Sequence, residues 1–409
     1  MINAADTVWM LIATALVMVM VPTLAFFYGG LVRKKNILSV LMQCMVLLCA
    51  ISLFWVLIGY SLAFGPDQKG LIGNLSWVGL SSVGLNPSPD YASTIPHQLF
   101  MAFQMMFAII TPALIVGTFV ERIKFSGFLI FSLLWSAFIY CPLAHWIWAK
   151  GGWLAEMGAL DFAGGAVIHI SAGIAALVFA ILLGKRCGIQ HHRSPHNLPF
   201  AVLGTGFLWF GWFGFNAGSA GAANTVAVAA FVNTNTAAAA GGIMWMLLDW
   251  KRNEVPTMLG LATGIIAGLA AVTPGAGYLS PLSALIIGVI SGTVCFFFVE
   301  KIKVKFGYDD SLDVFGVHGV AGIIGIIGVG FLATKKINPD GANGLFYGNI
   351  NQLWVQLLTA LVTILFAGLG TYLLYKIVDK IVGMRVEERE EYIGLDLSQH
   401  HETGYTLID

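Results

Sequence analysis

Two similar stretches decide the fold of this chain: Asp161-Phe-Ala-Gly-Gly-Ala-Val-Ile-His169-Ile-Ser-Ala-Gly-Ile174 and Asp313-Val-Phe-Gly-Val-His318-Gly-Val-Ala-Gly-Ile323. Each reads Asp, a stretch containing glycine, and then His-x-x-Ala-Gly-Ile. Each also opens an apolar segment of the length, about 20 residues, that a helix needs to cross a bilayer. The two segments are five spans apart. Because five is odd, the copies run in opposite directions, which is the pattern of an inverted-topology repeat.

Eleven such apolar segments occur along the chain. A membrane β-barrel would show shorter segments of alternating polarity, and these segments do not alternate. The first has no Lys or Arg before it and no small-residue cleavage site after it, so we expect a retained helix rather than a signal peptide. The predicted fold is an all-α polytopic membrane protein, with spans 1–5 and 6–10 as inverted five-helix repeats and span 11 at the periphery. The segments lie at 7–30, 38–64, 97–119, 125–147, 162–184, 198–220, 225–248, 257–275, 281–300, 313–333 and 351–378.

The composition excludes an ordinary soluble protein. Apolar residues make up 58% of the chain and charged residues 10%, against roughly 25% charged residues in an average soluble domain. The 21 Lys and Arg residues balance 21 Asp and Glu residues, so there is no basic field for nucleic acid. The five cysteines form no CxxC pair, which supports neither a disulfide framework nor a zinc site.

The basic residues indicate how the chain is oriented. With the N-terminus outside, 17 Lys and Arg residues fall in inner segments, and Lys69, Lys150, Lys335 and Lys336 fall in outer ones. This bias follows the positive-inside rule and predicts an N-out, C-in topology. We therefore expect a membrane domain at 1–384 and a cytosolic tail at 385–409. The inner residues are Arg33, Lys34, Lys35, Arg122, Lys124, Lys185, Arg186, Arg193, Lys251, Arg252, Lys301, Lys303, Lys305, Lys376, Lys380, Arg385 and Arg389.

Two histidines within the spans are the main functional candidates. At 1.5 Å per residue, His169 lies roughly 12 Å from Asp161, and His318 lies roughly 8 Å from Asp313 on the opposite side. In a core about 30 Å thick, the two imidazoles therefore approach each other near the middle. Ionisable residues inside a membrane are functional candidates by default. The alternatives are two separate histidines bonded to backbone and a bis-histidine haem.

Aromatic residues suggest a pocket for a small cation. The run from Trp209 to Ser219 interleaves large rings with glycines and ends in a hydroxyl, which suits the wall of such a pocket. Interfacial belts are the ordinary explanation for single Trp and Tyr residues. Asp161 has two interpretations, a helix N-cap or a buried carboxylate near the cation. For Asp313 the sequence favours a cap.

Several motifs resemble those of the Amt/Mep/Rh ammonium transporter family, the Amt type in particular. They occur in family order and cover essentially the whole chain. The motifs are Phe27-Tyr-Gly-Gly30, Ala102-Phe-Gln104, Asp161-Phe-Ala-Gly-Gly165, Gly211-Trp-Phe-Gly-Phe-Asn-Ala-Gly-Ser219 and Asp313-Val-Phe-Gly-Val-His-Gly319.

The resemblance implies a homotrimer in which each subunit has its own pore. Phe107, Trp148 and Ser219 look like the family's outer site, where ammonium is recruited. Phe107 and Phe215 look like the stacked pair that closes the pore below that site. Asp161 resembles the family's acidic residue near the outer site.

Deeper in the pore, His169 and His318 look like the twin-histidine pair that lines the family's hydrophobic conduit. The tail Glu390-Glu-Tyr-Ile-Gly-Leu-Asp-Leu-Ser-Gln399 resembles the cytosolic terminus, which works with PII signalling proteins where those occur. The charged tail either is a solvated end or folds against the inner loops.

The expected function is ammonium transport in which the ion is deprotonated on entering. Cation–π attraction is worth about 0.5–2 kcal/mol, whereas moving an intact ion into a dry pore costs up to tens of kcal/mol. We expect ammonia to pass the pore with a proton relayed separately, so that transport is electrogenic. The alternatives are a neutral ammonia channel and an ammonium sensor with little flux. No catalytic constellation, metal cluster or phosphate loop is evident, so we expect no enzyme activity, cofactor or metal. The expected location is the plasma (cell inner) membrane.

Overall fold

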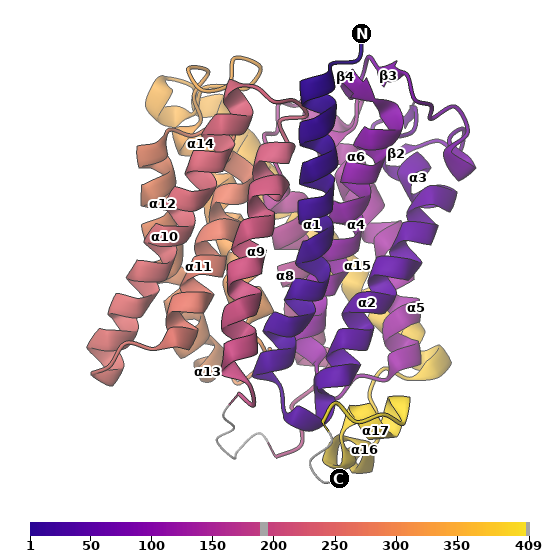
Figure 1. Ribbon diagram of the computed structural model, residues 1–409, viewed down its shortest axis with the longest axis vertical. Coiled ribbons are helices and arrows are strands. Elements are labelled where there is room, and N and C mark those ends of the chain that lie inside the picture. Colours follow the sequence, from indigo (N-terminus) through magenta and orange to yellow (C-terminus); the bar gives the residue numbers. More distant parts are fainter. Residues whose placement is uncertain (189–194, 406–409) are drawn as a thin grey trace.

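The computed structural model describes residues 1–188 and 195–405. Its helices stand side by side along the long axis of the molecule, and the two termini lie at opposite ends (Figure 1). Eleven helices in the described part are long and apolar enough to cross a membrane, so the predicted number of spans is confirmed. The end with the N-terminus is called the upper end below, and the end with the tail the lower end. Arg193 and residues 406–409 of the predicted tail lie outside the described residues.

Five spans are single α-helices, and six change their turn type along the way. The single helices are α1 (Ala4–Leu31), α4 (His97–Phe119), α9 (Leu198–Gly218), α10 (Thr225–Asn253) and α15 (Ile350–Val382). The composite spans are η1 (Lys34–Asn36), α2 (Ile37–Phe54), η2 (Trp55–Gly59) and α3 (Tyr60–Phe64); α5 (Phe125–Trp135), η4 (Ser136–Tyr140) and α6 (Cys141–Trp148) with the short α7 (Trp153–Glu156); η5 (Gly165–Ile170) and α8 (Ser171–Leu183); α11 (Met258–Val272) and η6 (Thr273–Gly275); α12 (Pro281–Phe297), η7 (Phe298–Ile302) and α13 (Lys303–Phe306); and η8 (Phe315–Gly319) and α14 (Val320–Leu332).

Short elements outside the spans cover both ends of the bundle. At the upper end, two small hairpins pair β1 (Asp67–Gln68) with β2 (Ile72–Gly73) and β3 (Pro87–Ser88) with β4 (Ala92–Pro96), both antiparallel. Two 3-10 turns, η3 (Val78–Leu80) and η9 (Leu345–Tyr347), complete the upper loops. At the lower end, α16 (Glu388–Ile393) and α17 (Leu395–His400) form the tail.

Side-chain caps fix where several spans begin. The Asn3 side chain accepts hydrogen bonds from the backbone N–H groups of Ala5 and Asp6 at the start of α1. Asn197, Asn224 and Thr257 occupy the same position before α9, α10 and α11, and each accepts one N–H of the first turn. Asn and Thr are favoured at this position because they satisfy donors that have no partner inside the helix.

The two repeat motifs cross each other at their glycines. A Cβ atom added to Gly173 would lie 2.2 Å from the Cα atom of Gly319, and one added to Gly322 would lie 3.0 Å from the Cβ atom of His169. Gly173 and Gly322 are the corresponding glycines of the two motifs, so each copy packs its glycine on the histidine turn of the other. Such reciprocal contact is what an inverted repeat requires, and close backbone approach is how membrane helices associate.

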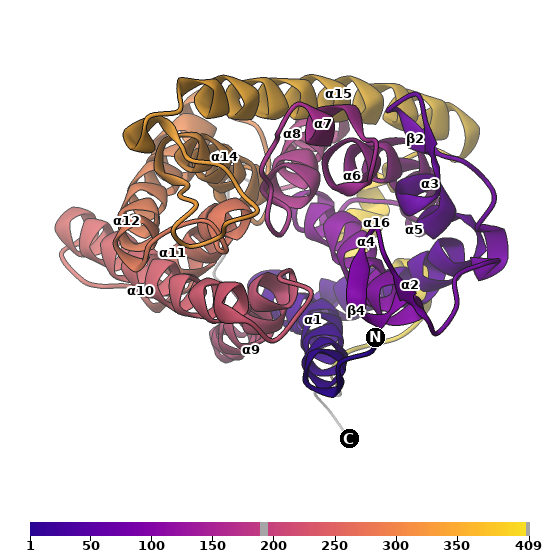
Figure 2. The same ribbon diagram turned by 90° about the horizontal axis from the view of Figure 1, so that it is seen from above.

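Seen from above, α15 runs along one edge of the molecule (Figure 2). It packs against α5, α8 and α14, and therefore touches both repeats without lying between them.

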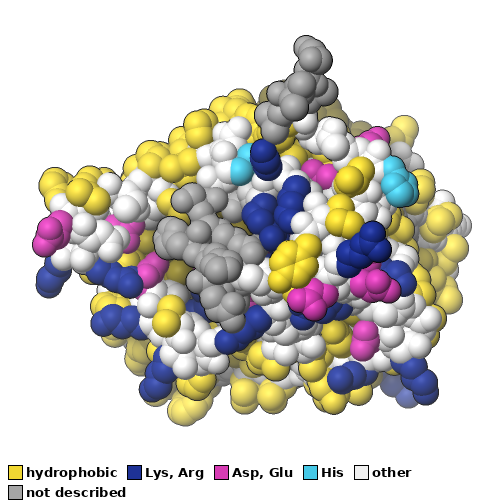
Figure 3. Space-filling model, turned by 90° about the horizontal axis from the view of Figure 1, so that it is seen from below, with side chains coloured by type: hydrophobic (Ala, Val, Ile, Leu, Met, Phe, Trp, Pro, Cys, Tyr) yellow, Lys and Arg dark blue, Asp and Glu magenta, His cyan; other side chains and the backbone are white. Residues whose placement is uncertain are grey.

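The lower face gathers Lys and Arg side chains (Figure 3). They belong to the loops and helix ends that close the spans at this end, as the alternation of the predicted inner segments requires. The N-out, C-in prediction would make this lower face the inner one.

Candidate functional site

Three cavities follow one another through the bundle. An upper and a lower cavity each have a volume of about 210 Å³, and a narrow cavity between them has a volume of about 10 Å³. The narrow cavity shares Phe27, Ile266 and His318 with the lower one. It meets the upper cavity at Phe107 and Phe215, whose rings touch. The cavities thus form one path, interrupted by side chains rather than by backbone.

The upper cavity brings together Phe107, Trp148 and Ser219, three residues assigned to one site from the sequence. The rings of Phe107 and Trp148 lie 6.0 Å apart between centroids. The Ser219 hydroxyl donates its hydrogen to the Phe215 carbonyl at 2.9 Å, so its oxygen keeps lone pairs for accepting hydrogen bonds. The Trp148 indole donates to the backbone carbonyl of Asp161 at 2.8 Å, which fixes the plane of its ring.

Two further polar groups line the upper cavity without having been chosen from the sequence. The Gln104 Oε1 atom is buried and has no hydrogen-bond partner, which makes it an unused acceptor beside Phe103 and Phe107. Gln104 was visible only as part of a family motif. Asp90 comes from the loop between β3 and β4 and pairs with the exposed Lys150; no pattern in that loop indicated it.

The rings of Phe107 and Phe215 close the path below the upper cavity. Their centroids lie 4.6 Å apart, and their planes stand at 89°. The resemblance implies a stacked pair, and the structure has the two rings edge to face instead, a favoured geometry for aromatic pairs. Both rings are buried, so a passing molecule requires at least one of them to move.

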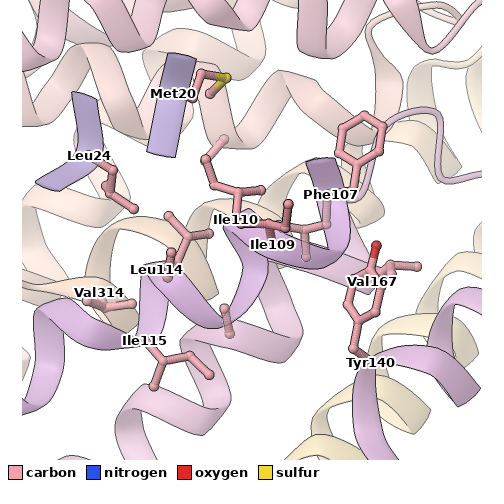
Figure 4. Packing of buried hydrophobic residues seen from close by; sticks show 14 of the residues in the cluster. Met20, Leu24, Phe107, Ile109, Ile110, Leu114, Ile115, Tyr140, Val167 and Val314 are labelled. Carbon is pink, nitrogen blue, oxygen red and sulfur yellow. The ribbon is translucent and has the colours of Figure 1, made fainter. Parts of the chain in front are cut away.

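The narrow cavity is apolar apart from two histidines. Leu24 of α1 and Ile110 and Leu114 of α4 surround a common space (Figure 4). His169 and His318 lie on the same cavity, with their Nδ1 atoms 3.3 Å apart and their ring planes within 15° of parallel. A cavity of this size holds roughly one water-sized molecule.

The histidines are partners of each other, which excludes the alternative of two separate backbone-bonded residues. One Nδ1 must donate and the other accept across their contact. The Nε2 atom of His169 is buried and has no partner, while Trp212 stacks on its ring at 5.6 Å. Among the described residues, no group of three or more His, Cys, Asp or Glu side chains could hold a metal ion.

Both histidines lie in π-helical turns, η5 and η8. Such wide turns are rare and concentrate at functional sites. Nothing in the sequence distinguishes them from α-helix, so the sequence analysis missed them. The corresponding placement of the two turns is a second sign of the repeat.

Asp161 caps η5 as one of its two interpretations predicted. Its two carboxylate oxygens accept the N–H groups of Gly164, Gly165, Ala166 and Val167 at 2.5–3.1 Å. Burial raises the pKa of this carboxyl, and the four hydrogen bonds oppose that rise. The carboxylate faces the helix end. Asp161 does not line the upper cavity, whereas its neighbour Phe162 does.

The expectation that Asp313 caps the second repeat helix is wrong. Asp313 has a left-handed backbone (φ 61°), and its carboxylate pairs with Lys303. The cap of η8 is Asp310, which accepts the N–H of Phe315 at 2.8 Å. The reason is the spacing: Asp310 precedes His318 by eight residues, as Asp161 precedes His169, whereas Asp313 is three residues too close.

Below the path, a buried ion-pair network joins the lower loops. Glu121 binds the Arg33 guanidinium and the Asn36 amide, and Arg186 bridges Glu121 to Asp309. Burial by itself would raise the pKa of the Glu121 carboxyl, but Arg186 and Arg33 hold it below its ordinary value. The network therefore keeps its charges at neutral pH.

The tail is folded against these loops rather than solvated. Arg385 pairs with Glu391, which is fully buried, and donates to the carbonyls of Leu183 and Lys185. The other oxygen of Glu391 accepts the N–H of Cys187 at 2.9 Å. Of the two alternatives from the sequence, a solvated end and a tail folded against loops, the structure has the second.

Comparisons with known proteins agree with this geometry. Residues 8–405 match the model of the Ammonium Transporter Family. The chain is 51% identical over 400 residues to an ammonium transporter of Bacillus subtilis (strain 168), covering 98% of both chains. It is 46% identical over 402 residues to ammonium transporter Amt1 of Archaeoglobus fulgidus, covering 98% of this chain and 99% of that one.

Solved structures show the same fold. The crystal structure of Candida albicans Mep2 superposes with a TM-score of 0.91 at 35% identity, covering 99% of this chain and 94% of that one. A sensor Amt protein superposes with a TM-score of 0.88 at 29% identity, covering 97% and 98%.

Proposed function

This multi-pass membrane protein belongs to the Ammonium Transporter Family, and we propose that its three cavities are the successive stages by which it transports ammonium. The observation that carries the proposal is the single path from the upper to the lower cavity, with a pair of histidines at its narrowest part. The direction of transport follows the predicted N-out, C-in topology, which makes the upper cavity the outer one.

In the upper cavity, ammonium is recruited by acceptors and rings together. Ser219 and Gln104 each offer an oxygen acceptor for an N–H group. Phe107 and Trp148 add cation–π attraction of about 0.5–2 kcal/mol each. These gains are far smaller than the tens of kcal/mol that an intact ion would lose in a dry passage. The ion therefore gives up a proton before it passes Phe107 and Phe215.

In the narrow cavity, neutral ammonia meets the two histidines. Each neutral imidazole can offer one donor and one acceptor nitrogen. Ammonia therefore keeps hydrogen-bond partners in a cavity whose other walls are apolar. Two imidazoles in contact titrate as a unit and avoid carrying two charges. We propose that this pair relays the released proton separately from ammonia, which makes transport electrogenic. Potassium has no proton to lose and is excluded at this step.

A sensor with little flux is the second candidate, favoured by the likeness to the sensor Amt protein. A path through the bundle with a histidine pair at its narrowest part supports transport better, because a sensor needs only the upper cavity. A neutral ammonia channel would use the same path without relaying the proton.

We further propose a domain and assembly plan that follows from the sequence. Residues 1–384 form the membrane domain and 385–409 the cytosolic tail, in the plasma (cell inner) membrane. A homotrimer is supported by an apolar groove on the outside of α1, α9 and α10, where Trp9, Val228 and Phe231 lie. A PII signalling protein would bind the lower face, where the tail and the basic loops meet.

The test is ammonium-triggered current in proteoliposomes, with potassium as the control ion. A transient that saturates with ammonium and is absent with potassium is the expected result. No current with ammonium would contradict the proton relay. An interior pH assay on the same vesicles would then separate a neutral channel, which raises the interior pH, from a sensor, which does not.

A further inference from the structure

The two repeat helices are capped by carboxylates that differ in how they are satisfied. Asp161 uses both oxygens to accept four backbone N–H groups. Asp310, its counterpart eight residues before His318, accepts the N–H of Phe315 with Oδ2, while Oδ1 is buried without a hydrogen-bond partner. A cap needs only the first of these bonds. The free oxygen of Asp310 is therefore not explained by capping.

Asp310 also lies where a proton could be taken up. Its side chain is 1% exposed, and burial together with the Asp313 carboxylate raises its pKa to about 6, against the lowering effect of Lys303. The cap of the upper repeat has four backbone hydrogen bonds that favour its charged form, whereas Asp310 has one, from Phe315, and a weaker interaction with the Thr118 side chain. The groups that face Asp310 are Tyr28, Thr118, Lys303, Tyr308 and Asp313.

The position of Asp310 joins it to the path. The residues directly after it, Ser311 to Asp313, line the lower cavity together with Tyr28 and His318. Their backbone is held to the lower end of α4, since the Leu312 N–H donates to the Gly117 carbonyl at 3.0 Å. A proton that leaves the histidine pair toward the lower end therefore enters a cavity lined by the residues that directly follow Asp310.

We propose that Asp310 is the proton-holding residue below the histidine pair, which binds the relayed proton on its carboxylate and releases it to the lower cavity. The inference rests on the proposed electrogenic transport. The balance is simple: ammonium gives one proton to the relay and passes as ammonia, the Asp310 carboxylate becomes a carboxylic acid, and that proton then returns to ammonia or water in the lower cavity.

Asp313 is the obvious competitor, because it lines the lower cavity itself. Its carboxylate is already paired with the Lys303 ammonium, which favours the charged form and opposes proton uptake. Asp313 is therefore the matched control: a carboxylate of the same loop, nearer to the cavity, in a different electrostatic setting.

The test compares D310N and D313N with the wild type in proteoliposomes. D310N keeps an oxygen for the Phe315 N–H but cannot bind a proton. We expect it to lower the ammonium-triggered current about tenfold or more while keeping ammonia conductance, read as the rise of interior pH above that of empty vesicles. D313N should retain a current, and because it removes a carboxylate that raises the pKa of Asp310, it should move the pH dependence of that current below that of the wild type. The wild-type current should also fall as the pH on the lower side drops through about 6, because Asp310 then stays protonated, and D310N should lose this dependence.

Each other outcome is decisive. Wild-type vesicles without current would refute the electrogenic mechanism itself. Wild-type current that persists in D310N would refute only the role of Asp310. Loss of both current and ammonia conductance in a D310N protein with wild-type thermal stability would likewise overturn the proposal, since Asp310 would then act as a cap alone.

Discussion

Replacing Ser219 with alanine removes one hydrogen-bond acceptor from the upper cavity and little else. The hydroxyl of Ser219, the residue that ends α9, donates to the Phe215 carbonyl one turn earlier, so its loss removes one bond at the helix end and no bond to another helix. What disappears is the oxygen lone pair that faces the cavity. The fold and the two rings beside it should remain as they are.

The size of the effect follows from the charge of the ligand. A hydrogen bond to a charged group is worth about 1.5–3 kcal/mol, and 1.4 kcal/mol corresponds to about a tenfold change in affinity. The cavity, at about 210 Å³, has room for several waters, and one of these can replace the lost acceptor in part. The expected result is therefore the lower end of the range, about a tenfold rise in the half-saturating ammonium concentration with little change in maximal current.

The assay is the concentration dependence of ammonium-triggered current in proteoliposomes. Thr205→Val is the matched control, because Thr205 on the same helix makes the same type of bond, to the Ala201 carbonyl at 2.9 Å, but lines none of the three cavities. An unchanged half-saturating concentration in S219A, or an equal rise in T205V, would refute the reasoning that Ser219 accepts a hydrogen bond from the ion.

Four further predictions follow. H169A should abolish or alter the charge transfer that accompanies ammonium transport. An ammonium-driven current equal to that of the wild type would contradict the proton relay. Truncation after Met384 removes Arg385 and Glu391, and with them the bonds that tie the tail to the lower loops. It should lower both transport and thermal stability, whereas unimpaired transport and unchanged regulation would mean that the docked tail has no role. G173V adds a side chain at a position where a Cβ atom alone would lie 2.2 Å from the Cα atom of Gly319. We expect the free energy of unfolding to fall by several kcal/mol, read as a strongly lowered yield of folded protein. The same substitution at Gly206, where an added Cβ atom meets nothing within 4 Å, is the control that should be tolerated. E121Q should lower the melting temperature most at neutral pH. Because Arg186 and Arg33 depress the pKa of Glu121, the stability that its charge contributes is complete above about pH 4.3 and is lost as the pH falls through the depressed pKa. The melting temperatures of wild type and variant should therefore converge in acid.

The sequence predicted those features that depend on the length and polarity of continuous segments. The eleven spans and the meeting of His169 with His318 follow from the rise of a helix and the thickness of a bilayer. The π-helical turns that hold both histidines could not be predicted, because they differ from α-helix by one residue per turn and share its composition. Their placement depends on the packing of the two repeats at Gly173 and Gly322.

The cap of the second repeat shows a different kind of failure. Asp309, Asp310 and Asp313 lie within five residues of one another, and composition does not say which of them begins the helix. The structure divides their roles by their partners: Asp309 binds Arg186, Asp310 caps η8, and Asp313 binds Lys303. Alignment of the repeats by their distance from the histidines, eight residues in each, would have selected Asp310.

Symmetry and asymmetry have separate parts in this fold. The repeat brings two histidines to the same depth from opposite sides and explains why the path is narrowest between them. An exactly symmetric protein would recruit its substrate equally at both ends. Here the upper cavity holds aromatic rings with two acceptor oxygens, Ser219 and Gln104, while the lower cavity lies beside a carboxylate, Asp310, with one oxygen unused. The upper end is therefore suited to holding a cation and the lower end to returning a proton, so that the difference between the two ends, not the repeat itself, gives the path its chemical direction.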